Sequence, residues 1–121
     1  MTNKLSKPIA GYHLLMILSA VDNKFHVQED LVIRDWLLAQ FPFKVNLDKE
    51  LEVISTINPA DFMQHFNKAM DDFYMDSDEQ ERKQLVSFAI KLAKSDRFIT
   101  KEENLFLNEL FEKWDLVSDT L

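Results

Sequence analysis

Apolar residues recur at intervals of three and four along most of this chain, which is the spacing of helices that bury one face. The pattern predicts six helices joined by short polar connections, at residues 8–21, 27–40, 47–55, 59–74, 77–94 and 100–114. The fourth has the broadest apolar face, so we expect it at the centre of a bundle. A partner-binding groove lined with Met and Phe is the alternative for that face.

Helix-starting residues support these boundaries. Asn46 and Asn58 stand where caps are needed, and Pro59 follows the second of them in the favoured first position. Two capping boxes are predicted, in which a hydroxyl and a side chain three residues later each satisfy a backbone N–H. They pair Ser77 with Gln80 and Thr100 with Glu103.

One stretch of the chain occurs twice in degenerate form, at residues 14–37 and 88–111. Asp22 corresponds to Asp96, and the offset of 74 residues then holds without a gap. Each copy has an apolar helix, an Asp, a large apolar residue, a polar stretch, a Glu and a second apolar helix. The repeat predicts one helix–turn–helix unit used twice, with the two units related by a pseudo-twofold axis.

Composition narrows the fold to one all-α domain spanning residues 1–121. The chain has one Gly, three Pro and no Asn-Gly or Asp-Gly pair, so hairpin turns are not expected. With no Cys, there is no disulfide, thiolate nucleophile or sulfur ligand, which fits a cytoplasmic protein. The apolar run at residues 14–21 is too short to span a membrane and recurs inside the chain at 88–95, so it is not expected to be a targeting signal.

The charge of the chain argues against a nucleic-acid-binding protein. The formal net charge is −7 and the basic residues are scattered, whereas a phosphate-backbone binder needs a basic stripe. An acidic chain instead favours cations or basic protein partners. The densest acidic run is a solvated connector or a docking surface for a basic partner, and comprises Asp71, Asp72, Asp76, Asp78, Glu79 and Glu81.

The repeated turns resemble those of the TerB family of tellurite-resistance proteins. The segments are AVDNKFHVQE at residues 20–29 and AKSDRFITKE at 93–102, followed by Glu103, and the closing LNELFEKWDL resembles the last helix of that family. The resemblance implies an all-helical fold, acidic residues associated with metal ions and a stress or tellurite-resistance role. The family's Gly after the Asp is Asn23 and Arg97 here, so the second turn is expected to differ in detail.

Acidic residues at the two turns are the candidate metal ligands. Carboxylate oxygens suit a hard divalent cation such as Ca²⁺ or Mg²⁺. The alternative is helix capping, since Glu103 also completes a box with Thr100, but His26 is a poor cap and leaves Glu29 without such a partner. EF-hand loops are excluded, because the spacing of their ligands is absent from both turns. The candidate set is Asp22, Glu29, Asp96, Glu102 and Glu103.

Other catalytic patterns are missing from the sequence. His13, His26 and His65 have no metal-ligand spacing, and no nucleophile motif or phosphate-binding glycine loop occurs. We therefore expect a non-enzymatic, TerB-like module that binds a divalent cation and acts through protein partners. The alternatives are a metal-free interaction scaffold and, less favoured, a hydrolase that uses a metal-activated water.

Overall fold

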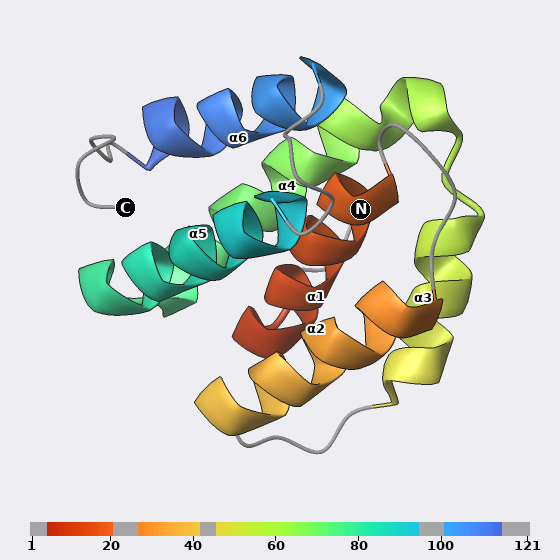
Figure 1. Cartoon of the computed structure of the whole chain (residues 1–121), viewed down its shortest axis with the longest axis horizontal. Helices are drawn as coiled ribbons and strands as arrows, with labels where there is room; N and C mark the ends of the chain where they lie inside the picture. The colour runs from red at the N-terminus through yellow and green to blue at the C-terminus, as the bar shows by residue number, and fades with distance from the viewer. Residues whose placement is uncertain (1–4, 21–26, 42–45, 95–100, 115–121) are drawn as a thin grey trace.

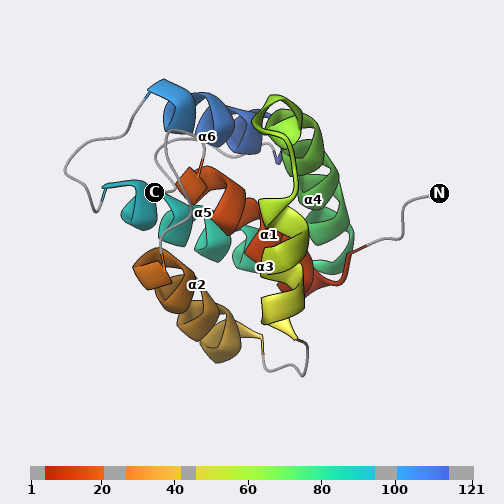
Figure 2. The ribbon, with the colours of Figure 1, turned by 90° about the vertical axis from the view of Figure 1, so that its right-hand side faces the viewer.

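The computed structural model describes residues 5–20, 27–41, 46–94 and 101–114. Within these ranges the chain is helical and contains no strand, which confirms the expected all-α class. Figures 1 and 2 show the helices gathered into one bundle. The elements are α1 (Lys7–Ala20), α2 (Val27–Gln40), α3 (Leu47–Ser55), the 3₁₀ helix η1 (Pro59–Asp61), α4 (Phe62–Asp76), α5 (Glu79–Lys94) and α6 (Lys101–Lys113).

The centre of the bundle is α1, so the expectation that residues 59–74 would form the central helix is wrong. Every residue from Ala10 to Ala20 is buried, and α1 contacts all five other α-helices. In both ribbon views the other helices surround it. The cause is that α1 is apolar on all sides, whereas α4 has exposed polar residues such as Gln64 and Asp71 on its outer side.

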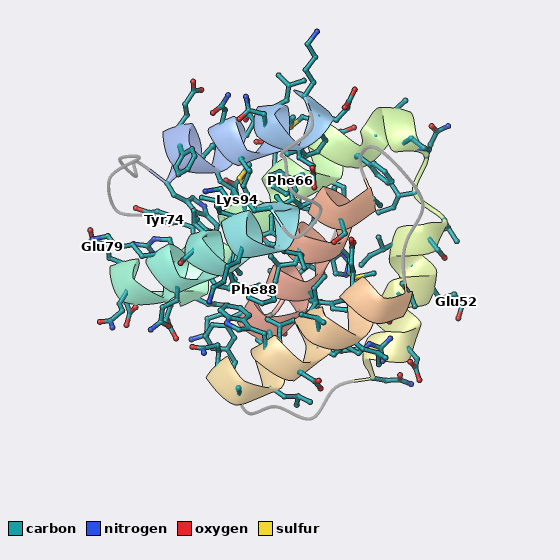
Figure 3. The ribbon with its side chains drawn as sticks, in the orientation of Figure 1. Glu52, Phe66, Tyr74, Glu79, Phe88 and Lys94 are labelled. Atoms are coloured by element: carbon teal, nitrogen blue, oxygen red, sulfur yellow. The ribbon has the colours of Figure 1, made fainter. Side chains whose placement is uncertain are left out.

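The apolar face of α4 belongs to the core, and the alternative of an open groove on this face is excluded. Its residues Phe62, Phe66, Ala69, Met70 and Phe73 are buried. Two aromatic contacts join α4 to α6 and to Trp114, the residue that follows α6. Phe66 lies inside the bundle (Figure 3) and meets Phe106 edge-on, while Phe73 stacks on Trp114.

Two predicted caps are present where the sequence placed them. The Asn46 side chain accepts a hydrogen bond from the backbone N–H of Lys49, and Asn58 accepts one from Ala60 N–H. Pro59 begins a single 3₁₀ turn before α4, so the predicted helix at 59–74 is divided into η1 and α4. The Thr100 cap lies outside the described residues and stays a prediction.

The capping box of α5 is shifted by one residue from its predicted place. Asp78 accepts a hydrogen bond from Glu81 N–H, and the Glu81 carboxylate accepts one from Asp78 N–H. Ser77 instead ends α4, with its N–H donated to the carbonyl of Tyr74. The sequence offers overlapping acceptors here, and a carboxylate on both sides of the box makes the stronger, charge-assisted pair of hydrogen bonds.

The only glycine of the chain lies at a close approach between helices. A Cβ added to Gly11 would lie 3.2 to 3.4 Å from side-chain atoms of Leu37, Leu85 and Phe73. The absence of a side chain therefore lets α1 approach α2, α4 and α5 together.

The helix boundaries agree with the offset found in the sequence. α1 and α5 end at Ala20 and Lys94, and α2 and α6 begin at Val27 and Lys101, so each pair is 74 residues apart. Burial differs between the copies, because α1 is enclosed and α5 is exposed along one side. The superposition of the two units about a pseudo-twofold axis stays a prediction.

Candidate functional site

The first turn of α2 carries a carboxylate that is not satisfied by the rest of the described structure. Glu29 is half-buried and its Oε2 atom is shielded from solvent, yet this oxygen has no hydrogen-bond partner in the described part of the chain. A buried, unpaired carboxylate oxygen is costly, so native structures usually place a donor, a water or a cation beside it. Glu29 thus has the chemistry expected of a cation ligand.

The neighbouring acid, Asp30, has two partners within the bundle. Its Oδ1 accepts a hydrogen bond of 2.6 Å from the Tyr12 hydroxyl and one of 2.9 Å from Arg34 Nε. Arg34 also donates from Nη1 to Asp48 of α3 at 2.8 Å. Burial, together with the hydrogen bond to Asp30, raises the pKa of Tyr12 well above its ordinary value, so the hydroxyl keeps its proton. Asp30 therefore joins α2 to α1, and Arg34 joins it to α3.

The equivalent turn before α6 presents its two acids differently. Glu103 corresponds to Glu29 in the repeat and is 9% exposed, whereas Glu102 is exposed to solvent. Glu103 makes an interaction within the structure and is not a free residue. Of the two described glutamates, Glu103 is placed inward as Glu29 is, and Glu102 faces the solvent as a capping or surface acid does.

The described acids of the two turns do not form one common site. Asp22 and Asp96 lie outside the described residues. In both views α2 lies along the lower edge of the molecule and α6 along the upper edge (Figures 1 and 2). Among the residues that the structure describes, no group of three or more His, Asp or Glu side chains is arranged to hold a metal ion. Glu29 and Glu103, which begin helices at opposite edges of the bundle, are therefore not ligands of one common ion.

A polar cluster that the sequence analysis did not identify joins three helices. His13 of α1 places Nδ1 2.7 Å from Nε2 of His65 on α4, and its Nε2 lies 2.8 Å from Glu50 Oε1 on α3. Because a carboxylate accepts, His13 Nε2–H donates to Glu50, and the neutral pair is completed when His65 Nε2–H donates to His13 Nδ1. The sequence signal was a histidine inside the most apolar run of the chain.

Both imidazoles of this cluster are held in the neutral form. Burial lowers the pKa of His13, although the Glu50 carboxylate acts in the opposite direction. Burial, followed by repulsion from His13 and Lys68, lowers the pKa of His65 to about 4. The hydrogen bonds of the cluster join α3 to α1 and α4.

Two shallow hollows on the surface are lined by other residues. One follows the outer side of α5, and the second lies where α4 and α6 end, with Tyr74, Met75 and Trp114 in its wall. Neither is lined by the histidine cluster or by the first-turn glutamates, so neither adds a substrate pocket to them.

Two further findings bear on the class of protein. In the ranges that the structure describes, no helix has the length and apolar character needed to cross a membrane. The resemblance to the TerB family rests on the motifs at residues 20–29 and 93–102. Comparison with models of protein families, with curated proteins and with solved structures finds no match for this chain.

Proposed function

We propose that this protein is a non-enzymatic, TerB-like module that binds a divalent cation, Ca²⁺ or Mg²⁺, at its acidic helix turns and acts through protein partners. The observation that carries the proposal is the buried Oε2 of Glu29, which lacks a partner in the described part of the chain. A hard cation would satisfy this oxygen and compensate its charge. Asp22, which precedes Glu29 in the same turn, is the expected second ligand.

The two turns are expected to differ in affinity. Glu29 has a carboxylate oxygen without a hydrogen-bond partner in the described part of the chain, whereas Glu103 already makes an interaction within the structure. Asp96, Glu102 and Glu103 would therefore form the weaker site. Because α2 and α6 lie on opposite edges of the bundle, few carboxylates can serve one ion (Figures 1 and 2). Affinities in the range of roughly 10⁻⁴ to 10⁻³ M are expected from so few ligands.

The test compares cation binding to the wild type with binding to Glu29→Gln and Asp22→Asn. Titration calorimetry and thermal melting with Ca²⁺ and Mg²⁺ should show binding to the wild type. At ~10 times the dissociation constant, binding should add about 1.4 kcal/mol to the free energy of unfolding. Both variants should lose this effect, and Glu29→Gln should not lower stability without cation, because it removes a buried charge.

A matched control is available on α3. Glu52 is exposed and points away from the bundle (Figure 3), so Glu52→Gln removes the same charge without touching either turn. This control should bind cations as the wild type does. The cation proposal is contradicted if millimolar Ca²⁺ and Mg²⁺ leave wild-type melting unchanged, or if Glu52→Gln loses as much binding as Glu29→Gln.

A metal-free interaction scaffold is the second candidate function. The observation that favours it is the set of large apolar side chains left exposed on α2. If the cation test fails, the acids of the turns serve as caps and this scaffold function becomes the best account of the chain.

A further inference from the structure

The outer side of α2 carries apolar side chains that the bundle leaves uncovered. Leu31, Val32 and Leu38 are 55%, 49% and 50% exposed. Leu31 and Leu38 lie two helical turns apart on one line, and Val32 lies beside them. Ile33 and Leu37 point to the opposite side and are fully buried in the core. We call Leu31, Val32, Asp35 and Leu38 the outer face of α2.

The surroundings of the outer face differ from those of Leu105, an exposed leucine on α6. Leu105 of α6 is 61% exposed, but the residues around it on that helix are polar, as Glu102 and Asn108 are. Single exposed apolar residues are normal on a protein surface, whereas a row of them marks a contact site. α2 is apolar on two sides, and both ribbon views place it at an edge with its outer side open (Figures 1 and 2).

Charge indicates what kind of partner would cover this face. Asp35 is exposed between Leu31 and Leu38 and makes no ion pair or hydrogen bond with the described residues. The adjacent cation, Arg34, is already held by Asp30 and Asp48. The carboxylate in the middle of the apolar row is therefore available to a positive charge from outside.

The same carboxylate argues against a second copy of this chain. In a symmetric antiparallel pairing of two α2 helices, residues midway between Leu31 and Leu38 meet near the twofold axis. Asp35 would then face Asp35 of the other copy, and each chain has a formal net charge of −7. Like charges in direct contact oppose association, whereas opposite charges favour it.

We propose that the outer face of α2 binds an amphipathic helix of a partner protein, one with apolar residues two turns apart and a Lys or Arg between them that pairs with Asp35. The proposal rests on the part of the proposed function that concerns protein partners and is independent of the cation. Helix-to-helix docking of this kind buries the two leucines and desolvates the ion pair.

The experiment uses two synthetic helical peptides of about 18 residues as probes. Both carry the same row of leucines and Gln at the other positions, and they differ only in the residue between the leucines, which is Lys in one and Glu in the other. Fluorescence anisotropy in EDTA should show that the Lys peptide binds the wild type and that the double variant Leu31→Gln/Leu38→Gln weakens this at least about tenfold. Gln retains helix propensity, so the variant should fold normally by far-UV circular dichroism.

Three controls define the outcome. Leu105→Gln should bind the Lys peptide within about twofold of the wild type, since it removes an equally exposed leucine elsewhere. Asp35→Lys should reverse the preference from the Lys peptide to the Glu peptide, because the charge in the face is inverted. Glu29→Gln should bind the peptide normally even though it is expected to lose the cation, which separates the two proposals.

The proposal is overturned if the Lys peptide does not bind, or if Leu31→Gln/Leu38→Gln and Leu105→Gln bind it equally. It is also overturned if Asp35→Lys leaves the peptide preference unchanged. Sedimentation of the wild type tests whether the chain dimerises instead. A dimer that Leu31→Gln/Leu38→Gln dissociates would show that a second copy covers the face.

Discussion

At the scale of single residues, the buried polar groups of this protein act as ties between helices. Tyr12 and Asp30 join α1 to α2, and the hydrogen-bonded row of Glu50, His13 and His65 joins α3, α1 and α4. A buried polar group is favourable only while its partner stays in place, so these contacts specify one arrangement of the helices. We expect the histidine pair also to make that arrangement sensitive to acid.

Acid should destabilise the fold through this pair. The folded-state pKa of His13 is lowered and that of His65 is lowered to about 4, while an unfolded histidine titrates near 6.5. As the pH falls below about 6.5, the unfolded chain binds protons that the folded chain rejects. The free energy of unfolding should therefore fall by up to about 1.4 kcal/mol per pH unit for each histidine, until the pH reaches the folded pKa values.

Urea denaturation between pH 7 and pH 5 measures this effect before most carboxylates titrate. The wild type should lose stability across that range, and the double variant His13→Gln/His65→Gln should lose much less. The two proteins are compared by how steeply the free energy of unfolding changes with pH, because the substitutions also change stability at pH 7. An equal slope in both proteins would show that the pair is not the source of the acid sensitivity.

The candidate site could be predicted from sequence only in part. Glu29, Glu102 and Glu103 were identified because acids near a repeated turn form a local pattern, and the structure distinguishes the inward Glu29 and Glu103 from the outward Glu102. The histidine cluster could not be found in this way. His13, Glu50 and His65 lie on three helices and only their packing brings them together, although a histidine within an apolar run did indicate a buried polar group.

At the scale of helices, local signals predicted boundaries well and packing order poorly. Asn46 and Asn58 act within one turn of their own positions, so their caps could be predicted directly. The central helix depends on competition among all the helices for burial. α4 has the larger aromatic side chains, but α1 is the one without a polar side, and that decides which helix is enclosed.

The register of the α5 cap can be tested by two substitutions. Asp78→Ala removes the acceptor of Glu81 N–H and should cost about 0.5 to 2 kcal/mol of stability. Ser77→Ala should cost only a few tenths of a kcal/mol of stability, because the Ser77 hydroxyl caps no N–H of α5. This hydroxyl bonds to the Tyr74 carbonyl and to Arg82, and both bonds are exposed or partly exposed. Denaturant midpoints measure both effects. A larger loss for Ser77→Ala would place the box at Ser77 and Gln80, as the sequence pattern predicts.

At the scale of the whole molecule, the helices of the two segments that the sequence predicts to be a repeat share one core. The buried apolar residues drawn from all six α-helices form a single cluster, although the chain could have folded as two separate helix pairs. One aromatic contact joins residues 14–37 to residues 88–111. Trp36 of α2 stacks on Phe88, which lies between α5 and α2 in Figure 3.

A shared core predicts that the protein unfolds in one cooperative step. The two tryptophans report on different parts of the bundle, since Trp36 contacts α5 whereas Trp114 stacks on Phe73 and donates from Nε1 to the carbonyl of Met70 in α4. Trp36→Phe and Trp114→Phe each leave one fluorescent reporter. In each variant the fluorescence transition in urea should coincide with the far-UV circular dichroism transition, and the two variants should have the same dependence on denaturant concentration. Fluorescence and circular dichroism midpoints that separate within either variant would instead show two units that unfold independently, which would divide the chain at the repeat rather than unite it around α1.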